Sequence, residues 1–107
     1  INTAGELVAP PTVERALRTL DTVSDALVVG LPDERWGQIV AALIVPSPAG
    51  RAQASSMNAE ALSEALSEAL APWEKVRRIA VVDELPTTPT GKPDPLAAAE
   101  ILMASRL

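Results

Sequence analysis

The 107-residue chain contains no cysteine and no histidine. Without cysteine it can hold no disulfide, thiolate nucleophile or sulfur-ligated metal. Without histidine it lacks the imidazole base and the usual nitrogen ligand of zinc or iron. Any chemistry must therefore come from lysine, arginine, carboxylate, hydroxyl or backbone amide groups, and we expect no metal site.

Positive charge and long apolar runs are also scarce. The formal net charge is −5, which argues against a nucleic-acid partner because phosphate backbones are bound by clustered lysine and arginine. No run approaches the roughly 20 apolar residues that span a bilayer, and no signal peptide is visible. We therefore expect a cytoplasmic domain without a membrane span.

The only aromatic residues are Trp36 and Trp73, and the other hydrophobic residues are almost all small aliphatic ones. Such side chains suit helices packed on a sheet. Apolar runs predict strands at residues 26–29, 39–45 and 79–82. The second run is uninterrupted until a proline ends it, which is typical of a central strand buried on both faces.

Helical periodicity and proline positions define the remaining segments. A leucine repeat predicts a helix that Asn58 or a nearby serine caps and Pro72 ends. Further helices are expected at residues 11–20 and 95–107, an extended or hairpin segment at 3–9, a loop at 46–56, and a stiff extended segment at 86–95. This order predicts an α+β fold with a small, mostly antiparallel sheet of about three strands and packed helices.

Lysine occurs only twice, as Lys75 and Lys92. Lys92 follows Pro89-Thr90-Gly91 and precedes Pro93, which places a cation on a tight turn between rigid arms. Gly91 lets another backbone or a ligand approach closely. The string alone is weak, since a solvent-facing lysine in an ordinary polar loop has the same pattern.

Several runs gain meaning from their order along the chain. Residues 28–38 read Val-Val-Gly-Leu-Pro-Asp-Glu-Arg-Trp-Gly-Gln and are followed by an apolar run ending at Pro46. Ala71-Pro72-Trp73, Arg77-Arg78-Ile79 and residues 82–92 continue the series, and Ala4-Gly5-Glu6 opens it. Together these runs resemble the C-terminal domain of the AMP-forming acyl-CoA synthetases, or adenylate-forming ligases, over nearly the whole chain.

The resemblance implies a lid that moves over a larger N-terminal domain. It identifies Lys92 as the catalytic residue of acyl-AMP formation, with Thr90 and Gly91 supporting its turn. ATP and Mg²⁺ would be bound mainly by the N-terminal domain, which would also bind the carboxylic acid substrate, and CoA would be the co-substrate. The chain begins at Ile1 and not at Met, so we expect that domain and the hinge to precede it.

The same resemblance implies residues for the thioester-forming step. Gly5 and Glu6 would border the channel of the CoA thiol, while Trp36 and Trp73, with Lys75 and Arg77, would hold the CoA nucleotide. Aromatic faces beside cations suit an adenine ring and phosphates. Two alternatives stay open: Gly5 as a plain turn glycine, and the tryptophans as caps on the edge of the core.

Departures from the family pattern and other functions remain to be weighed. Ala4 replaces a first glycine, Leu7 stands where many members have a polar residue, and Pro93 and Pro95 replace an aliphatic and a basic residue. The alternatives are the lid of a peptide-synthetase adenylation domain, an oxidative luciferase-type enzyme, and a non-enzymatic α+β binding module. In the leading interpretation the chain alone is inactive.

Overall fold

Two long antiparallel strands, β3 (Val23–Asp33) and β4 (Gly37–Pro46), form the centre of the fold in the computed structural model, which describes residues 1–53 and 57–105. Residues 40–44 of β4 are at most 1% exposed, because layers of side chains cover the sheet on both faces at this strand. The predicted central strand is therefore confirmed.

Three shorter strands complete the sheet around β4. β1 (Asn2–Thr3) pairs with the start of β4 through Thr3 and Gly37, and β2 (Glu6–Leu7) pairs with β1. β5 (Val76–Val81) lies beside β4 and parallel to it, with Ile79 opposite Ala42. In register, β3 and β4 run from Val23 opposite Pro46 to Asp33 opposite Gly37.

The predicted α+β class is confirmed, but the sheet is larger than expected. In the described part of the chain it has five strands and is mixed, whereas about three mostly antiparallel strands were expected. The parallel pair arises because the chain passes through a helical connection between β4 and β5, and a crossover of this kind brings the next strand back in the same direction.

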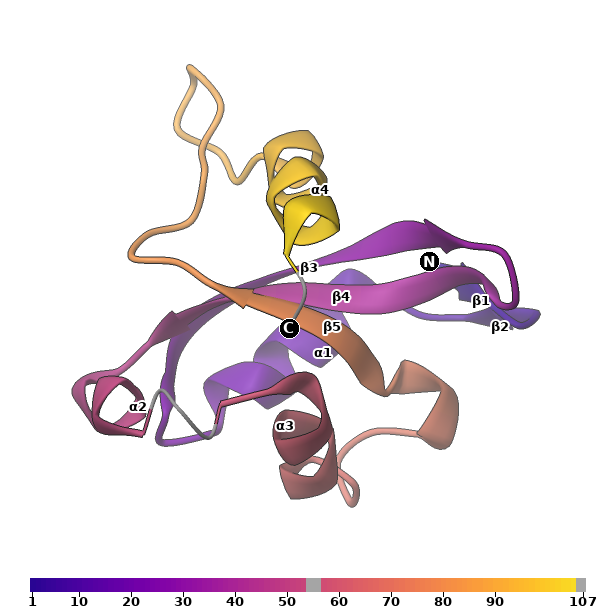
Figure 1. Ribbon diagram of the computed structural model, residues 1–107, viewed down its shortest axis with the longest axis horizontal. Helices are drawn as coiled ribbons and strands as arrows, with labels where there is room; N and C mark the ends of the chain where they lie inside the picture. The colour runs from indigo at the N-terminus through magenta and orange to yellow at the C-terminus, as the bar shows by residue number, and fades with distance from the viewer. Residues whose placement is uncertain (54–56, 106–107) are drawn as a thin grey trace.

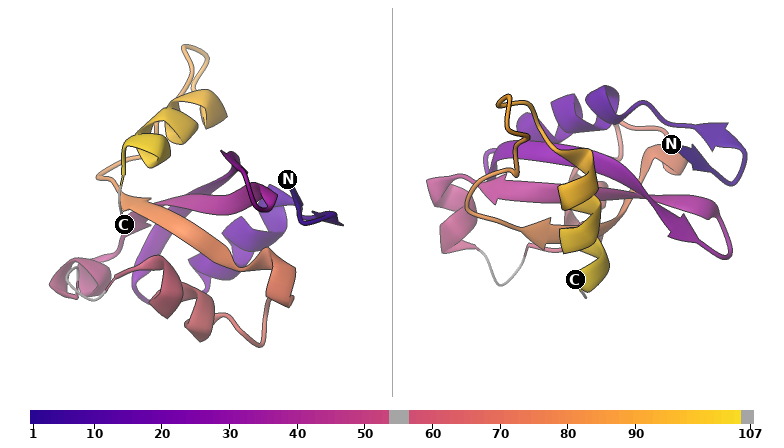
Figure 2. Two further views of the ribbon diagram at one scale, coloured as in Figure 1. Left: turned by 45° about the vertical axis from the view of Figure 1, so that its right-hand side comes forward. Right: turned by 90° about the horizontal axis from the view of Figure 1, so that it is seen from above.

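Helices cover both faces of the sheet (Figure 1). α1 (Pro10–Arg18) and α3 (Ala59–Ala65) pack on one face, where Val13 and Leu17 join Leu62 in one core cluster. α4 (Pro95–Ala104) packs on the other face and contributes Ala98 and Leu102 to a second cluster. The turned views show the same two layers around the sheet (Figure 2).

The predicted long helix after residue 57 is shorter than its leucine repeat. Asn58 caps it as expected, since its Oδ1 accepts from the Ala61 N–H at 2.8 Å. α3 ends at Ala65. Turns follow in which a backbone N–H donates to the carbonyl three residues earlier, as from Ser67 to Glu64. Leu66 and Leu70 are nevertheless buried. The apolar repeat therefore indicated burial correctly but overstated the helix.

The predicted loop at residues 46–56 contains a short helix, α2 (Pro48–Ala52), which corrects that expectation. Ser47 starts it by accepting the Gly50 N–H on its Oγ at 3.1 Å, and Pro48 suits the first turn of a helix. Residues 54–56 lie outside the described residues. A single 3₁₀ turn, η2 (Pro72–Glu74), leads into β5.

The other predicted elements are present with shifted ends. β3 is longer than the predicted strand at 26–29, and β5 begins earlier than the one at 79–82. α1 and α4 match the expected first and last helices, although residues 106–107 lie outside the described residues. Within the described residues, none of the helices combines the length and apolar character needed to cross a membrane.

Candidate functional site

Lys92 lies on a narrow loop between β5 and α4 that projects from the sheet on the same side as α4 (Figures 1 and 2). Thr87 and Pro93 form a bridge across the base of this loop. At its tip, the Thr88 N–H donates to the Lys92 carbonyl at 2.7 Å and the Gly91 N–H donates to the Thr88 carbonyl at 2.9 Å. We call residues 87–93 the Lys92 loop.

Gly91 gives this loop its sharp turn. Its φ is +85°, in a region that glycine adopts without steric cost. The Thr88 hydroxyl lies 3.0 Å from that of Thr90 and also accepts from the Lys92 backbone N–H at 3.3 Å. Thr90 and Gly91 thus shape the turn that carries Lys92.

The Lys92 side chain is exposed, and it forms no ion pair with another of the described residues. The two ion pairs among the described residues join Arg18 to Asp25 and Arg51 to Asp83. The ammonium of Lys92 is therefore available to an anionic group on another body. An exposed lysine contributes little to the stability of the fold. Any strong interaction of Lys92 therefore depends on a group outside this domain.

The base of the Lys92 loop is tied to the start of α4. The Asp94 backbone N–H donates to the Pro86 carbonyl at 3.0 Å. The Asp94 side chain caps α4 by accepting the Ala97 N–H on Oδ1 at 3.2 Å. Because Ala98 and Leu102 anchor α4 on the sheet, the loop is connected to the rigid body of the domain.

A second group of predicted site residues lies around the N-terminal hairpin. Ala4 and Gly5 form its two-residue turn, with φ values of +52° and +87°, as in the type I′ turns that suit short hairpins. The Ala4 N–H donates to the Trp36 carbonyl at 2.7 Å. Gly5 and Glu6 therefore lie beside the turn that carries Trp36.

Trp36 meets two cations. The guanidinium carbon of Arg77 lies 4.4 Å from the centroid of the Trp36 ring, and that of Arg35 lies 5.4 Å away; both are within cation–π range. The Trp36 backbone is held by a 2.7 Å hydrogen bond from its N–H to Asp33 Oδ2. Arg35 is a contact that the predicted site lacks, although its place next to Trp36 in a turn was a usable signal.

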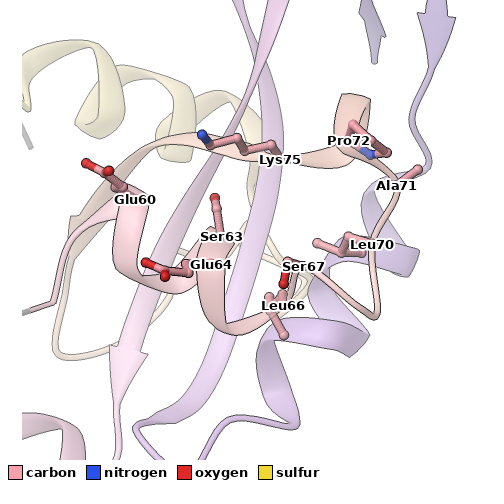
Figure 3. A pocket seen from close by; sticks show the side chains of 9 residues that line it. All are labelled: Glu60, Ser63, Glu64, Leu66, Ser67, Leu70, Ala71, Pro72 and Lys75. Carbon is pink, nitrogen blue, oxygen red and sulfur yellow. The ribbon is translucent and has the colours of Figure 1, made fainter.

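The structure does not gather all the predicted CoA residues at Trp36. Lys75 instead lines a groove of about 540 Å³ between α3 and the segment around η2. Figure 3 shows the Lys75 side chain extending toward the end of the groove that carries Glu60. Trp73 is 45% exposed on η2, so it is not a core residue. Sequence reasoning missed this groove, because its walls come from residues with ordinary helical patterning.

The two groups of site residues lie far apart on the domain. In both orthogonal views the Lys92 loop lies toward the end of the sheet opposite the β3–β4 hairpin turn that carries Trp36 (Figures 1 and 2). The two longer extents of the molecule are 37 and 36 Å. A rigid domain of this shape cannot place both groups in one small cleft at the same time.

Residues 12–92 match the model of the AMP-binding enzyme C-terminal domain. This chain belongs to that family. Over 94 residues it is 42% identical to a medium/long-chain-fatty-acid–CoA/3-oxocholest-4-en-26-oate–CoA ligase of Mycobacterium marinum. The matched region covers 88% of this chain and 16% of the ligase. The chain therefore spans about a sixth of the length of the curated relatives it matches.

Solved structures share the fold of this chain. A fatty acyl CoA synthetase of Mycobacterium tuberculosis superposes with a TM-score of 0.81 at 29% identity, over 97% of this chain and 20% of that one. The amide bond synthetase McbA of Marinactinospora thermotolerans gives 0.83 at 29% identity, over 94% and 19%. The matched family region extends from α1 through the Trp36 turn to Lys92.

Proposed function

We propose that this chain is the mobile C-terminal lid of an AMP-dependent acyl-CoA synthetase. A larger N-terminal domain, joined by a hinge, binds ATP, Mg²⁺ and the carboxylic acid, and the lid is inactive alone. The CoA ligases among its relatives support this proposal, as does the exposed lysine on a defined turn. The amide bond synthetase that shares the fold means that the fold alone does not decide the acceptor.

In the first half-reaction, a carboxylate oxygen of the acid attacks the α-phosphorus of ATP. A new oxygen–phosphorus bond gives acyl-AMP, and the bond to pyrophosphate breaks. Lys92 provides a positive charge between the two approaching anions, which offsets their repulsion and orients the attacking oxygen. No base is needed, because the carboxylate is already ionised.

In the second half-reaction, the lid turns and presents its other end. The CoA thiolate attacks the acyl carbonyl carbon, a thioester bond forms, and AMP leaves. Gly5 and Glu6 border the path of the thiol, and Trp36 offers a ring on which the adenine of CoA can stack. Arg77 binds its phosphates, while Trp73, exposed on η2 just before β5, contacts the outer part of the same nucleotide.

One observation carries the two-step proposal: the Lys92 loop lies toward one end of the domain, and the β1–β2 and β3–β4 turns, which carry Gly5 and Trp36, lie toward the other (Figures 1 and 2). A single larger domain with one reactive centre can meet both regions only if the lid rotates between the steps. A non-enzymatic binding module would have no need for an unpaired lysine at one end and a cation-lined tryptophan at the other.

The full-length enzyme tests this proposal through its products. Incubation with ATP, Mg²⁺, CoA and a panel of acids that includes medium- and long-chain fatty acids should release pyrophosphate and form an acyl-CoA thioester. The 107-residue chain alone should do neither. Product formation with amines but not with CoA would assign the protein to amide synthesis, and pyrophosphate release by the pure fragment would contradict the lid assignment.

A further inference from the structure

The outward side of α4 is unusually apolar for an exposed helix. Of its ten residues, only Glu100 is charged. Leu96, Ala99 and Met103 follow the i, i+3, i+7 spacing that places side chains on one stripe of a helix, and Leu96 and Met103 are 80% and 62% exposed. We call these three residues the α4 stripe. Glu100, which is four residues after Leu96 and three before Met103, lies beside this stripe with its side chain exposed. Large exposed apolar side chains with a polar rim are typical of interaction surfaces.

The α4 stripe does not contribute its large side chains to the core of this domain. Ala98 and Leu102 supply the buried contacts of α4, and only Ala99 of the stripe packs partly against that cluster. Leu96 and Met103 therefore expose apolar surface to water, which is unfavourable. Contact with an apolar partner surface would remove this cost. Ile101, 38% exposed, lies on another flank of the helix by its spacing.

The stripe is continuous with the Lys92 loop. Leu96 lies in the first turn of α4, which follows the loop directly, and the Asp94–Pro86 hydrogen bond fixes the junction. The loop and α4 also lie on the same side of the sheet (Figures 1 and 2). A body that receives Lys92 therefore comes close to the start of the stripe.

The size of the relatives indicates what that body is. This chain corresponds to 16% of the Mycobacterium marinum ligase and 20% of the Mycobacterium tuberculosis structure, so about four fifths of such a protein lies outside it. We propose that the α4 stripe docks on an apolar surface of the larger domain of the same protein, beside its ATP site, in the orientation that delivers Lys92. This inference rests on the proposed function.

The proposal makes the stripe specific to one half-reaction. In the orientation that forms acyl-AMP, Leu96 and Met103 become buried and stabilise the delivered position of Lys92. In the orientation that forms the thioester, the opposite end of the domain faces the reactive centre and the stripe is released. Weakening the stripe should therefore slow the first step and leave the second unchanged.

The experiment uses the full-length enzyme with the double variant Leu96→Gln/Met103→Gln. Glutamine keeps a good helix propensity and similar length, and both side chains are exposed, so the unfolding temperature should not change. ATP–pyrophosphate exchange should slow at least about 10-fold, while thioester formation from supplied acyl-AMP should stay within about twofold of wild type. Val81→Thr is the control. Val81 is an exposed apolar residue at the end of β5, and the residues before and after it in the chain, Ala80 and Val82, pack in the α4 cluster, so Val81 faces the other side of the sheet.

Three results would overturn the proposal. Unchanged exchange in the double variant would show that the stripe does not dock during acyl-AMP formation. Equal slowing of both steps would contradict its restriction to one orientation. If light scattering shows that the wild-type enzyme is an oligomer and that the double variant is a smaller species, the stripe binds a second copy of the chain instead.

Lys92→Ala, measured in parallel, separates the stripe from the function on which it rests. If Lys92→Ala leaves exchange unchanged, the proposed function fails. If Lys92→Ala slows exchange and the double variant does not, only the stripe proposal fails.

Discussion

Ala4 occupies a backbone conformation that ordinarily belongs to glycine. Its φ is +52°, and no other non-glycine residue in the described part of the chain has a positive φ. For a residue with a β-carbon, this region costs about 1–2 kcal/mol. The turn nevertheless forms, because the Ala4 N–H is held by the Trp36 carbonyl and the Gly5 N–H by Asn2 Oδ1.

We expect Ala4→Gly to stabilise the domain. Relief of the strained φ outweighs the extra freedom that glycine gives the unfolded chain, which costs about 0.4–1 kcal/mol. The free energy of unfolding should rise by about 0.5–1 kcal/mol, measured by urea denaturation of the 107-residue chain. Ala61→Gly, on the exposed side of α3, should instead lower it by about 0.5–1 kcal/mol. A loss of stability in Ala4→Gly would refute the strain argument.

Trp36→Ala should weaken CoA binding in the full-length enzyme more than ATP binding. Stacking of a base on an aromatic ring is worth about 1–3 kcal/mol, so the apparent KM for CoA should rise about 5- to 150-fold, with the KM for ATP nearly unchanged. Trp73→Ala is predicted to have the same direction of effect. A variant that unfolds while its residual CoA affinity stays normal would make Trp36 a core residue.

At the residue scale, sequence reasoning identified which side chains matter better than which ones meet. Trp36 and Arg77 were both predicted site residues, and the structure places them in contact. Arg35 was missed, and Lys75 lines a different groove. The difference is physical: a contact between β5 and the β3–β4 turn depends on the sheet pairing, which composition and spacing do not reveal.

At the element scale, α4 and the Lys92 loop act as one unit through Asp94. Its carboxylate caps α4 and its backbone N–H bonds to Pro86. A helix cap of this kind is worth about 1 kcal/mol. We therefore expect Asp94 to position the Lys92 loop through the start of α4.

Asp94→Ala should slow acyl-AMP formation several-fold in the full-length enzyme, because the junction that orients the Lys92 loop loosens. Asn58→Ala is the matched control, since Asn58 caps α3 in the same way on the other face of the sheet. Both variants should lose about 1 kcal/mol of stability. If Asn58→Ala slows ATP–pyrophosphate exchange equally, loss of stability and not loop position is the cause.

Sequence patterns predicted β4, α4 and the N-terminal hairpin well, but they covered only part of β3 and overstated α3. β4 and α4 carry enough consecutive side chains for an apolar run to define them. The hairpin of the two-residue strands β1 and β2 was expected from Gly5, but its pairing with β4 through Thr3 and Gly37 was not. The direction of β5 follows from the crossover before it, which is a property of the chain path and not of residues 76–81.

At the scale of the whole molecule, the fold separates the two groups of proposed site residues. The Lys92 loop projects near α4. The β1–β2 and β3–β4 turns, which carry Gly5 and Trp36, lie toward the other end of the sheet (Figures 1 and 2). A rigid domain with two distant functional ends suits alternation over one reactive centre. Burial of residues 40–44 in β4 gives the domain a packed centre, so the proposed rotation would move both ends together.

The most direct test of this account is the pair of half-reactions in the full-length enzyme carrying Lys92→Ala. Acyl-AMP formation should slow by at least about 10²-fold, a typical loss for one electrostatic stabiliser, while thioester formation from supplied acyl-AMP should be nearly unchanged. Lys92→Arg should also be impaired in the first step, because a planar guanidinium directs its donors differently. Equal loss in both half-reactions, or loss in neither, would contradict delivery of Lys92 by a rotating lid.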